Sequence, residues 1–80
     1  MNIFSFIADD DGKTIWAQRN GVTMAIIYRH NSGVWHVFEA ADTPPAMRRA
    51  GLATNEDFPD EDAACDYVRG FMQKPELCVQ

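Results

Sequence analysis

The chain has 80 residues, which suits a single domain over residues 1–80 and allows burial of little more than ~60% of the surface that the unfolded chain exposes. Its 46% of hydrophobic and 24% of charged residues are typical of globular proteins, which excludes an intrinsically disordered chain. A net charge of −5 opposes nonspecific binding to nucleic acid or to an anionic membrane, and favours a basic protein surface as the partner.

The N-terminal segment 3–8 is apolar, but no Lys or Arg precedes it and no small-residue cleavage site follows it. It therefore lacks the pattern of a secretory signal. No segment approaches the ~20 consecutive apolar residues that span a bilayer. We expect a cytoplasmic protein, in which Cys65 and Cys78 remain free thiols.

Four strands joined by tight turns are predicted in the first half of the chain. Asp11-Gly12 and Asn20-Gly21 are residue pairs typical of hairpin turns, because they accept the positive φ that such turns require. The strands are expected at residues 3–8, 13–19, 22–29 and 34–39. Short loops between successive strands favour an antiparallel meander.

Side-chain alternation assigns residues to the two faces of this sheet. One side of the third strand is predicted to carry Val22, Met24, Ile26 and Tyr28, and the other Thr23, Ala25, Ile27 and Arg29. Both sides are partly apolar. One must cover the helix, so the other is expected to be a second contact surface. Trp16 and Trp35 are large side chains that we expect in the core.

Helical signals follow the fourth strand. Pro44-Pro45 interrupts strand pairing, and Thr43 is predicted to cap a short helical turn that ends at Arg49. Residues 52–57 are expected to form a connecting loop.

The main helix is predicted from Asp60, an N-cap residue, to Gln73, just before Pro75. Its apolar stripe is Ala64, Tyr67, Val68, Phe71 and Met72. The predicted fold class is α+β, with an antiparallel four-stranded meander packed by a C-terminal helix and a short helical turn in the connecting segment.

Residues with catalytic or metal-binding chemistry do not form a known pattern. His30, His36, Cys65 and Cys78 lack the paired spacing of zinc ligands, and the acidic turn at 9–11 is not followed by the remaining ligands of a calcium loop. No motif places a base beside Cys65. We expect a protein that is not an enzyme and that has no cofactor or metal.

Carboxylates are concentrated in two segments. The predicted partner-binding residues are Asp9, Asp10, Asp11, Glu56, Asp57, Asp60, Glu61, Asp62 and Asp66. The helix dipole explains acidic residues in the first helical turn, but it does not explain the others. Carboxylates one helical turn apart are ~6 Å from each other, similar to successive phosphates of a nucleic-acid strand. A merely solvated acidic face remains the alternative.

Residues 33–38, followed later by residues 57–64, resemble the small arm-type DNA-binding modules of phage integrases. This resemblance implies DNA binding. Those modules carry Lys and Arg on the sheet, where this chain has Lys13, Arg19 and Arg29.

The whole chain also resembles the small acidic anti-CRISPR proteins of phages and mobile elements in size, charge and layout, and residues 57–71 are similar to a segment of one such inhibitor. The resemblance implies a non-enzymatic inhibitor that binds a subunit of a CRISPR-Cas effector complex in the host cytoplasm, with acidic side chains occupying the nucleic-acid site. Two alternatives remain: a module for protein interaction or homodimerisation through the second sheet face, and a DNA-binding module.

Overall fold

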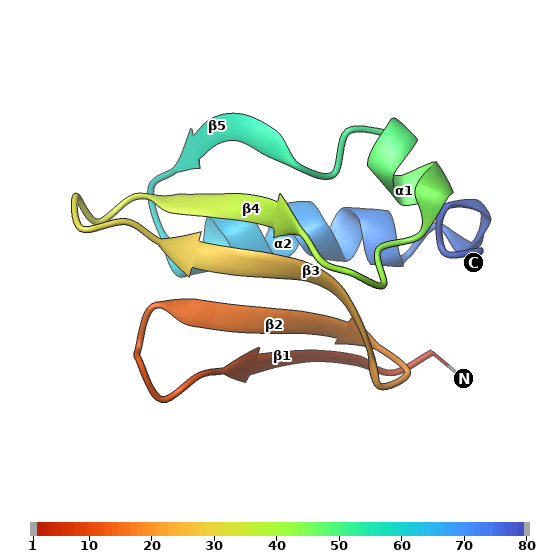
Figure 1. Cartoon of the computed structure of the whole chain (residues 1–80), viewed down its shortest axis with the longest axis horizontal. Coiled ribbons are helices and arrows are strands. Elements are labelled where there is room, and N and C mark those ends of the chain that lie inside the picture. Colours follow the sequence, from red (N-terminus) through yellow and green to blue (C-terminus); the bar gives the residue numbers. More distant parts are fainter. Residues whose placement is uncertain (1, 80) are drawn as a thin grey trace.

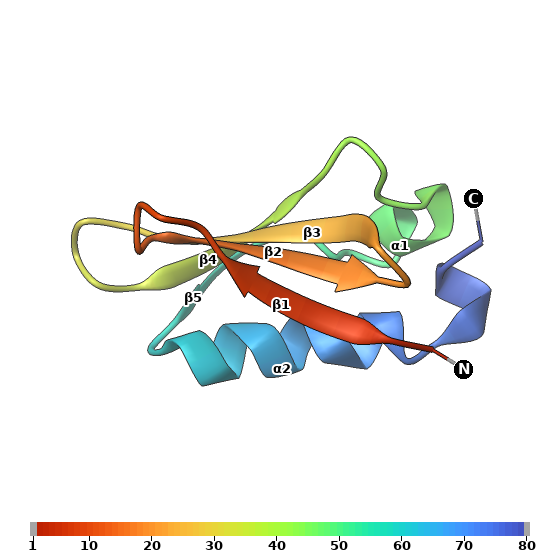
Figure 2. The same cartoon turned by 90° about the horizontal axis from the view of Figure 1, so that it is seen from below.

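Five antiparallel strands form one sheet in sequence order, β1-β2-β3-β4-β5, in a computed structural model that describes residues 2–79. The strands are β1 (Phe4–Ala8), β2 (Thr14–Arg19), β3 (Val22–Arg29), β4 (Trp35–Glu39) and β5 (Thr54–Phe58). The helices are α1 (Pro45–Arg49), α2 (Glu61–Met72) and a 3₁₀ turn, η1 (Pro75–Leu77). Helix α2 lies along one face of the sheet (Figures 1 and 2), which makes the molecule a two-layer α+β domain.

The four expected strands are confirmed, each within one residue of its predicted start. The turn between β2 and β3 has positive φ at both Asn20 and Gly21, as the sequence predicted. The prediction of only four strands is wrong, because residues 54–58 pair with β4 as a fifth strand. Its central residues are polar and exposed, so β5 lacks the alternation by which strands are recognised.

A β-bulge changes the faces of β3. Ala25 lies opposite Ala17, but Thr23 lies opposite Gln18, so Met24 has no partner on β2. Thr23 therefore joins the face of Ile26, while Met24 is buried with the residues that pack around α2. The predicted strict alternation, which placed Met24 beside Ile26 and Thr23 beside Ala25, is wrong at this point.

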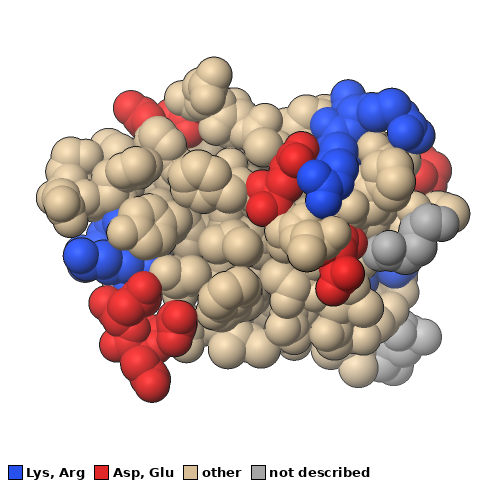
Figure 3. All heavy atoms as spheres, viewed as in Figure 1, with Lys and Arg blue, Asp and Glu red and all other residues tan. Residues whose placement is uncertain are grey.

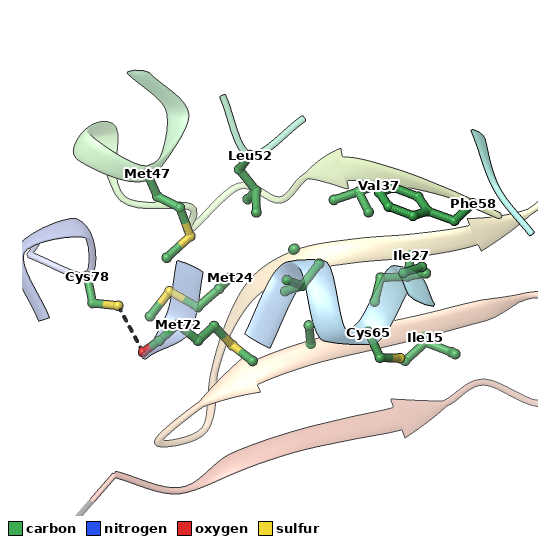
Figure 4. Packing of buried hydrophobic residues seen from close by; sticks show 14 residues of the cluster. Ile15, Met24, Ile27, Val37, Met47, Leu52, Phe58, Cys65, Met72 and Cys78 are labelled. Carbon is green, nitrogen blue, oxygen red and sulfur yellow. Dashed lines mark hydrogen bonds between the residues drawn. The ribbon is translucent and has the colours of Figure 1, made fainter. Parts of the chain in front are cut away.

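The core lies between the sheet and α2. Asp60 is the N-cap, as predicted, and its side chain accepts a hydrogen bond from the Ala63 backbone N–H. The predicted apolar stripe is confirmed: Ala64, Val68 and Met72 are fully buried, and Tyr67 and Phe71 pack partly buried at its margin. These residues meet the buried side chains of β2, β3 and β4, with Met47, Leu52 and Cys78 closing the core near the end of α2 (Figure 4).

The two tryptophans have different environments. Trp35 is half-buried and packs against the core, but Trp16 lies on the face of the sheet opposite to α2. Trp16 neighbours Ala17 on β2, and Ala17 is completely buried beneath the helix. Because successive residues of a strand point to opposite faces, Trp16 points away from the helix, and its predicted place in the core is wrong.

Thr43 has a different role from the predicted one. The N-cap of α1 is Pro44, and no side chain caps that helix. Thr43 is instead buried, and its Oγ1 donates to the Met24 carbonyl (2.6 Å) and accepts from the Ala40 N–H (2.7 Å). This hydroxyl joins the segment after β4 to the bulge of β3.

Replacement of Thr43 by Val keeps the shape of the side chain but leaves a buried carbonyl and a buried N–H without partners. We expect Thr43→Val to lower the free energy of unfolding by about 1–3 kcal/mol, measured by urea denaturation. Thr23→Val is the matched control, because Thr23 accepts a hydrogen bond only on the half-buried face away from the helix. Equal losses in both variants would contradict this role of Thr43.

Candidate functional site

The face of the sheet opposite to α2 carries apolar and aromatic side chains from four strands. We call it the open face and define it by Ile7, Trp16, Ile26, Tyr28, His36 and Phe38. Figure 3 looks onto this face and shows a continuous uncharged area over the middle strands, with acidic and basic groups around it. Among residues 2–79, no helix packs over it (Figure 2).

Strand register places the apolar residues of the open face in one row. Ile7 lies opposite Trp16, Trp16 opposite Ile26, and Ile26 opposite Phe38. The two ends of the row are the most exposed, with Ile7 at 47% and Phe38 at 43%. Directly opposite side chains contact each other, so the row forms a continuous apolar ridge across the sheet.

A second row consists of aromatic rings. Tyr28 is in edge contact with His30, whose ring centroid lies 4.2 Å from that of His36. The His36 ring in turn stacks with Phe38 at 6.3 Å. These rings extend the apolar ridge towards the turn between β3 and β4.

His36 also contacts β5. Its Nε2 lies 2.5 Å from Oδ1 of Asp57, although its N–H direction does not meet the geometry of a hydrogen bond. The Asp57 side chain remains 63% exposed, so a carboxylate stands at the β5 margin of the open face.

Most of the predicted acidic residues lie at one end of the molecule. Figures 1 and 2 both place the turn between β1 and β2, with Asp9–Asp11, at the same end of the long axis as the start of α2. Segments far apart in the sequence thus share one end, although they lie at different depths. We call this the acidic end, which comprises Asp9, Asp10, Asp11, Asp60, Glu61 and Asp62, while Glu56 and Asp57 lie on edge strand β5.

Several of these carboxylates stabilise the fold. Asp11 accepts hydrogen bonds from the backbone N–H groups of Lys13 and Thr14 and from the Thr14 hydroxyl. The backbone bond from Lys13 is the main cause of the lowered pKa of Asp11. Asp9 accepts from the Asp10 N–H, and Asp60 caps α2. Turn and cap geometry accounts for these three side chains.

Asp66 is exposed and forms an ion pair with Arg69 one turn along α2. The Arg69 guanidinium lies 4.9 Å from the centre of the Phe6 ring. Of the two carboxylates in the predicted row, Asp66 is paired with Arg69, and Asp62 forms no ion pair among the described residues. Asp10, Glu56, Glu61 and Asp62 are exposed, and among the described residues their side chains accept no hydrogen bond and form no ion pair.

Both cysteines are free and buried. Burial, reinforced by Glu61, raises the pKa of the Cys65 thiol to about 11, and burial also raises the pKa of Cys78. Thiols with raised pKa values are poor nucleophiles at neutral pH. Within residues 2–79, no pocket and no cluster of three metal-binding side chains is found, and no helix is long and apolar enough to cross a membrane.

Several residues of the open face were not predicted from the sequence. The sequence predicted a second apolar face of the sheet. Trp16 was assigned to the core, and Ile7, His36 and Phe38 were not named as part of a contact surface. Strand alternation and hairpin register were the available signals, since both place Trp16 beside Ile26 and Phe38.

Comparison with known proteins gives no relative from which a function can be carried over. No family model matches the chain, and neither a curated protein nor a solved structure is significantly similar to it.

The buried Cys65 thiol makes stability depend on pH. Above pH 9.0, the thiol of the unfolded chain ionises while the folded one keeps its proton up to about pH 11. The folded state then binds more protons, so stability falls as the pH rises through this window. We expect wild type to lose about 1–3 kcal/mol between about pH 8 and about pH 10.5 by urea denaturation, and Cys65→Ala to lose less.

Tyr67 and Cys78 also have raised pKa values, so part of the loss persists in Cys65→Ala. Cys78→Ala is the matched control and should retain most of the wild-type pH dependence. An identical loss in wild type and Cys65→Ala would contradict the assignment to Cys65.

Proposed function

We propose that the chain is a non-enzymatic protein-binding domain that contacts its partner through the open face. The observation that carries this proposal is the row of Ile7, Trp16, Ile26 and Phe38, which crosses four strands and over which no element of residues 2–79 packs. Contiguous apolar patches of this kind mark interaction sites in small domains. Aromatic residues at the centre of an interface also supply a large share of its binding energy.

The partner surface is expected to be apolar at its centre and basic around it. The chain has a net charge of −5, and Asp57 stands at the β5 margin of the open face. Exposed carboxylates at the acidic end, such as Asp10 and Asp62, would attract a positively charged surface before contact. Charge of this kind raises the association rate and orients the partner, while the apolar row keeps the complex together.

A subunit of a CRISPR-Cas effector complex is the narrower candidate, in agreement with the resemblance to small acidic anti-CRISPR proteins. The specific observation in its favour is that the two acidic segments, which are far apart in the sequence, share one end of the molecule. In this version, Asp10, Glu56, Glu61 and Asp62 occupy positions meant for phosphates, and binding weakens steeply with salt.

The test is a pulldown of the tagged chain from a bacterial lysate that contains CRISPR effectors, followed by affinity measurement with the recovered protein. We expect Phe38→Ser to weaken binding at least about tenfold with little change at high salt, because it removes an exposed ring from the apolar row. We expect the double variant Asp10→Lys and Asp62→Lys to weaken binding mainly at low salt.

Matched controls change the same kind of side chain elsewhere. Val22→Ser alters an exposed apolar residue on the helix side of the sheet, and Glu76→Lys alters an exposed carboxylate on η1, at the opposite end from the acidic end. Undiminished affinity in a folded Phe38→Ser variant would overturn the open face as the contact surface. Recovery of an effector subunit only at low salt, with loss in the Lys variant alone, would favour the acidic mimic.

A further inference from the structure

The two edges of the sheet differ in chemistry. Edge strand β5 has Asn55, Glu56 and Asp57 at its centre, and charged edges of this kind discourage pairing with another chain. Edge strand β1 reads Phe-Ser-Phe-Ile-Ala, with no charge and no proline. One edge is therefore protected against a further strand, and the other is not.

Hydrogen bonds at the two ends of β1 show which backbone groups face outwards. Asn20 N–H donates to the Ile3 carbonyl, and Asp9 N–H donates to the Thr14 carbonyl, so the odd-numbered residues bond to β2. In an antiparallel ladder the residues between them point their N–H and C=O groups the other way. Phe4, Phe6 and Ala8 therefore present their backbone groups at the free edge.

The core is also partly exposed to solvent at the β1 edge of the sheet. Phe4 and Phe6 lie on the helix side of the sheet but are only half-buried. Figure 1 shows α2 behind β3 and β4, so the helix does not extend past the outer edge of β1. A further strand beside β1 would cover more of the Phe4 ring and of the Phe6 ring, whose face already lies near the Arg69 guanidinium, and this adds apolar burial to the backbone hydrogen bonds.

We propose that β1 pairs antiparallel with β1 of a second copy, about a two-fold axis at Phe6. In this register Phe6 lies opposite Phe6 of the other copy, and Phe4 lies opposite Ala8. Because these are the residues with outward backbone groups, every outward N–H meets a carbonyl of the second copy. The pleat also matches, so both α2 helices lie on the same side of a continuous sheet.

Charge complementarity favours a second copy as the occupant. The antiparallel arrangement brings the acidic turn that follows Ala8 of one copy to the end of β1 of the other copy where Phe4 lies opposite Arg19. Arg19 reaches this position, since its Nη2 donates to Asn2 Oδ1 at 3.0 Å, and its buried Nε has no hydrogen-bond partner among the described residues. At each end of the uncharged centre, an acidic turn of one copy therefore lies near the Arg19 guanidinium of the other, in spite of the net charge of −5.

This pairing does not depend on the proposed partner of the open face, since it uses the strand edge rather than the sheet surface, and Asp10 is the one residue to which both proposals give a role. It places Ile7 of one copy opposite Ser5 of the other, on the side of the open face. Two open faces would then form one continuous surface, and loss of the dimer would leave each face intact.

The test combines sedimentation equilibrium with amide hydrogen exchange on the full chain, from about 10 µM to about 1 mM, a range suited to a small interface. We expect the mass to approach twice 9.0 kDa at high concentration. The amides of Phe4, Phe6 and Ala8 should gain at least about tenfold protection with concentration, while those of Ser5 and Ile7 stay protected throughout. Ala8→Pro should be monomeric, because it removes an outward donor that β2 does not use.

Ser5→Lys provides a second variant if the proline variant does not fold. It should weaken the dimer, while Asn55→Lys, the same change of charge on the other edge, should not. Arg19→Glu should weaken the dimer as well, and addition of Asp10→Arg should restore it. The proposal would be overturned if the wild type is monomeric at about 1 mM. It would also be overturned if the dimer persists in Ser5→Lys while the amides of Phe4, Phe6 and Ala8 remain unprotected. Loss of the dimer in Phe38→Ser but not in Ser5→Lys would also overturn it, because the copies would then meet through the open face.

Discussion

The packing of a single helix against a five-stranded sheet is the constraint on which the rest of the structure depends. Helix α2 has twelve residues and one apolar stripe, so it covers one face of the sheet and leaves the other to solvent. A short chain cannot bury enough apolar surface to cover both faces. Ile7 and Phe38 therefore remain exposed at the two ends of the apolar row, and no element of residues 2–79 covers that row.

Two local features improve the packing of the sheet against the single helix α2. The bulge at Met24 turns one more large apolar side chain towards α2, and Thr43 satisfies the Met24 carbonyl that is buried beside it. At the acidic end, Asp60 caps α2 and Asp11 closes the first turn, so part of the negative charge stabilises the fold. Other exposed carboxylates, including Asp10 and Asp62, have no such role among the described residues.

Features that depend on local sequence were predictable here, and features that depend on tertiary pairing were not. Turn pairs such as Asn20-Gly21, the cap at Asp60 and the 3–4 spacing in α2 each carry their own signal, and all were confirmed. Strand β5 and the bulge at Met24 arise from pairing with a neighbour, and their residues carry no alternation that shows it. The ion pair of Asp66 with Arg69 is different, because it joins residues three apart on α2 and so carried a local signal that the sequence analysis did not use.

The most direct test of the open face as a contact surface is site-specific photocrosslinking in a bacterial lysate that contains CRISPR effectors. A photoreactive phenylalanine analogue would replace Phe38 on the open face in one sample and Asp62 on α2 in another, both of them exposed positions. A partner crosslinked from position 38, with adducts that persist at high salt, is the expected result. Adducts from position 62 alone would contradict the open face as the contact surface and would assign binding to the acidic end.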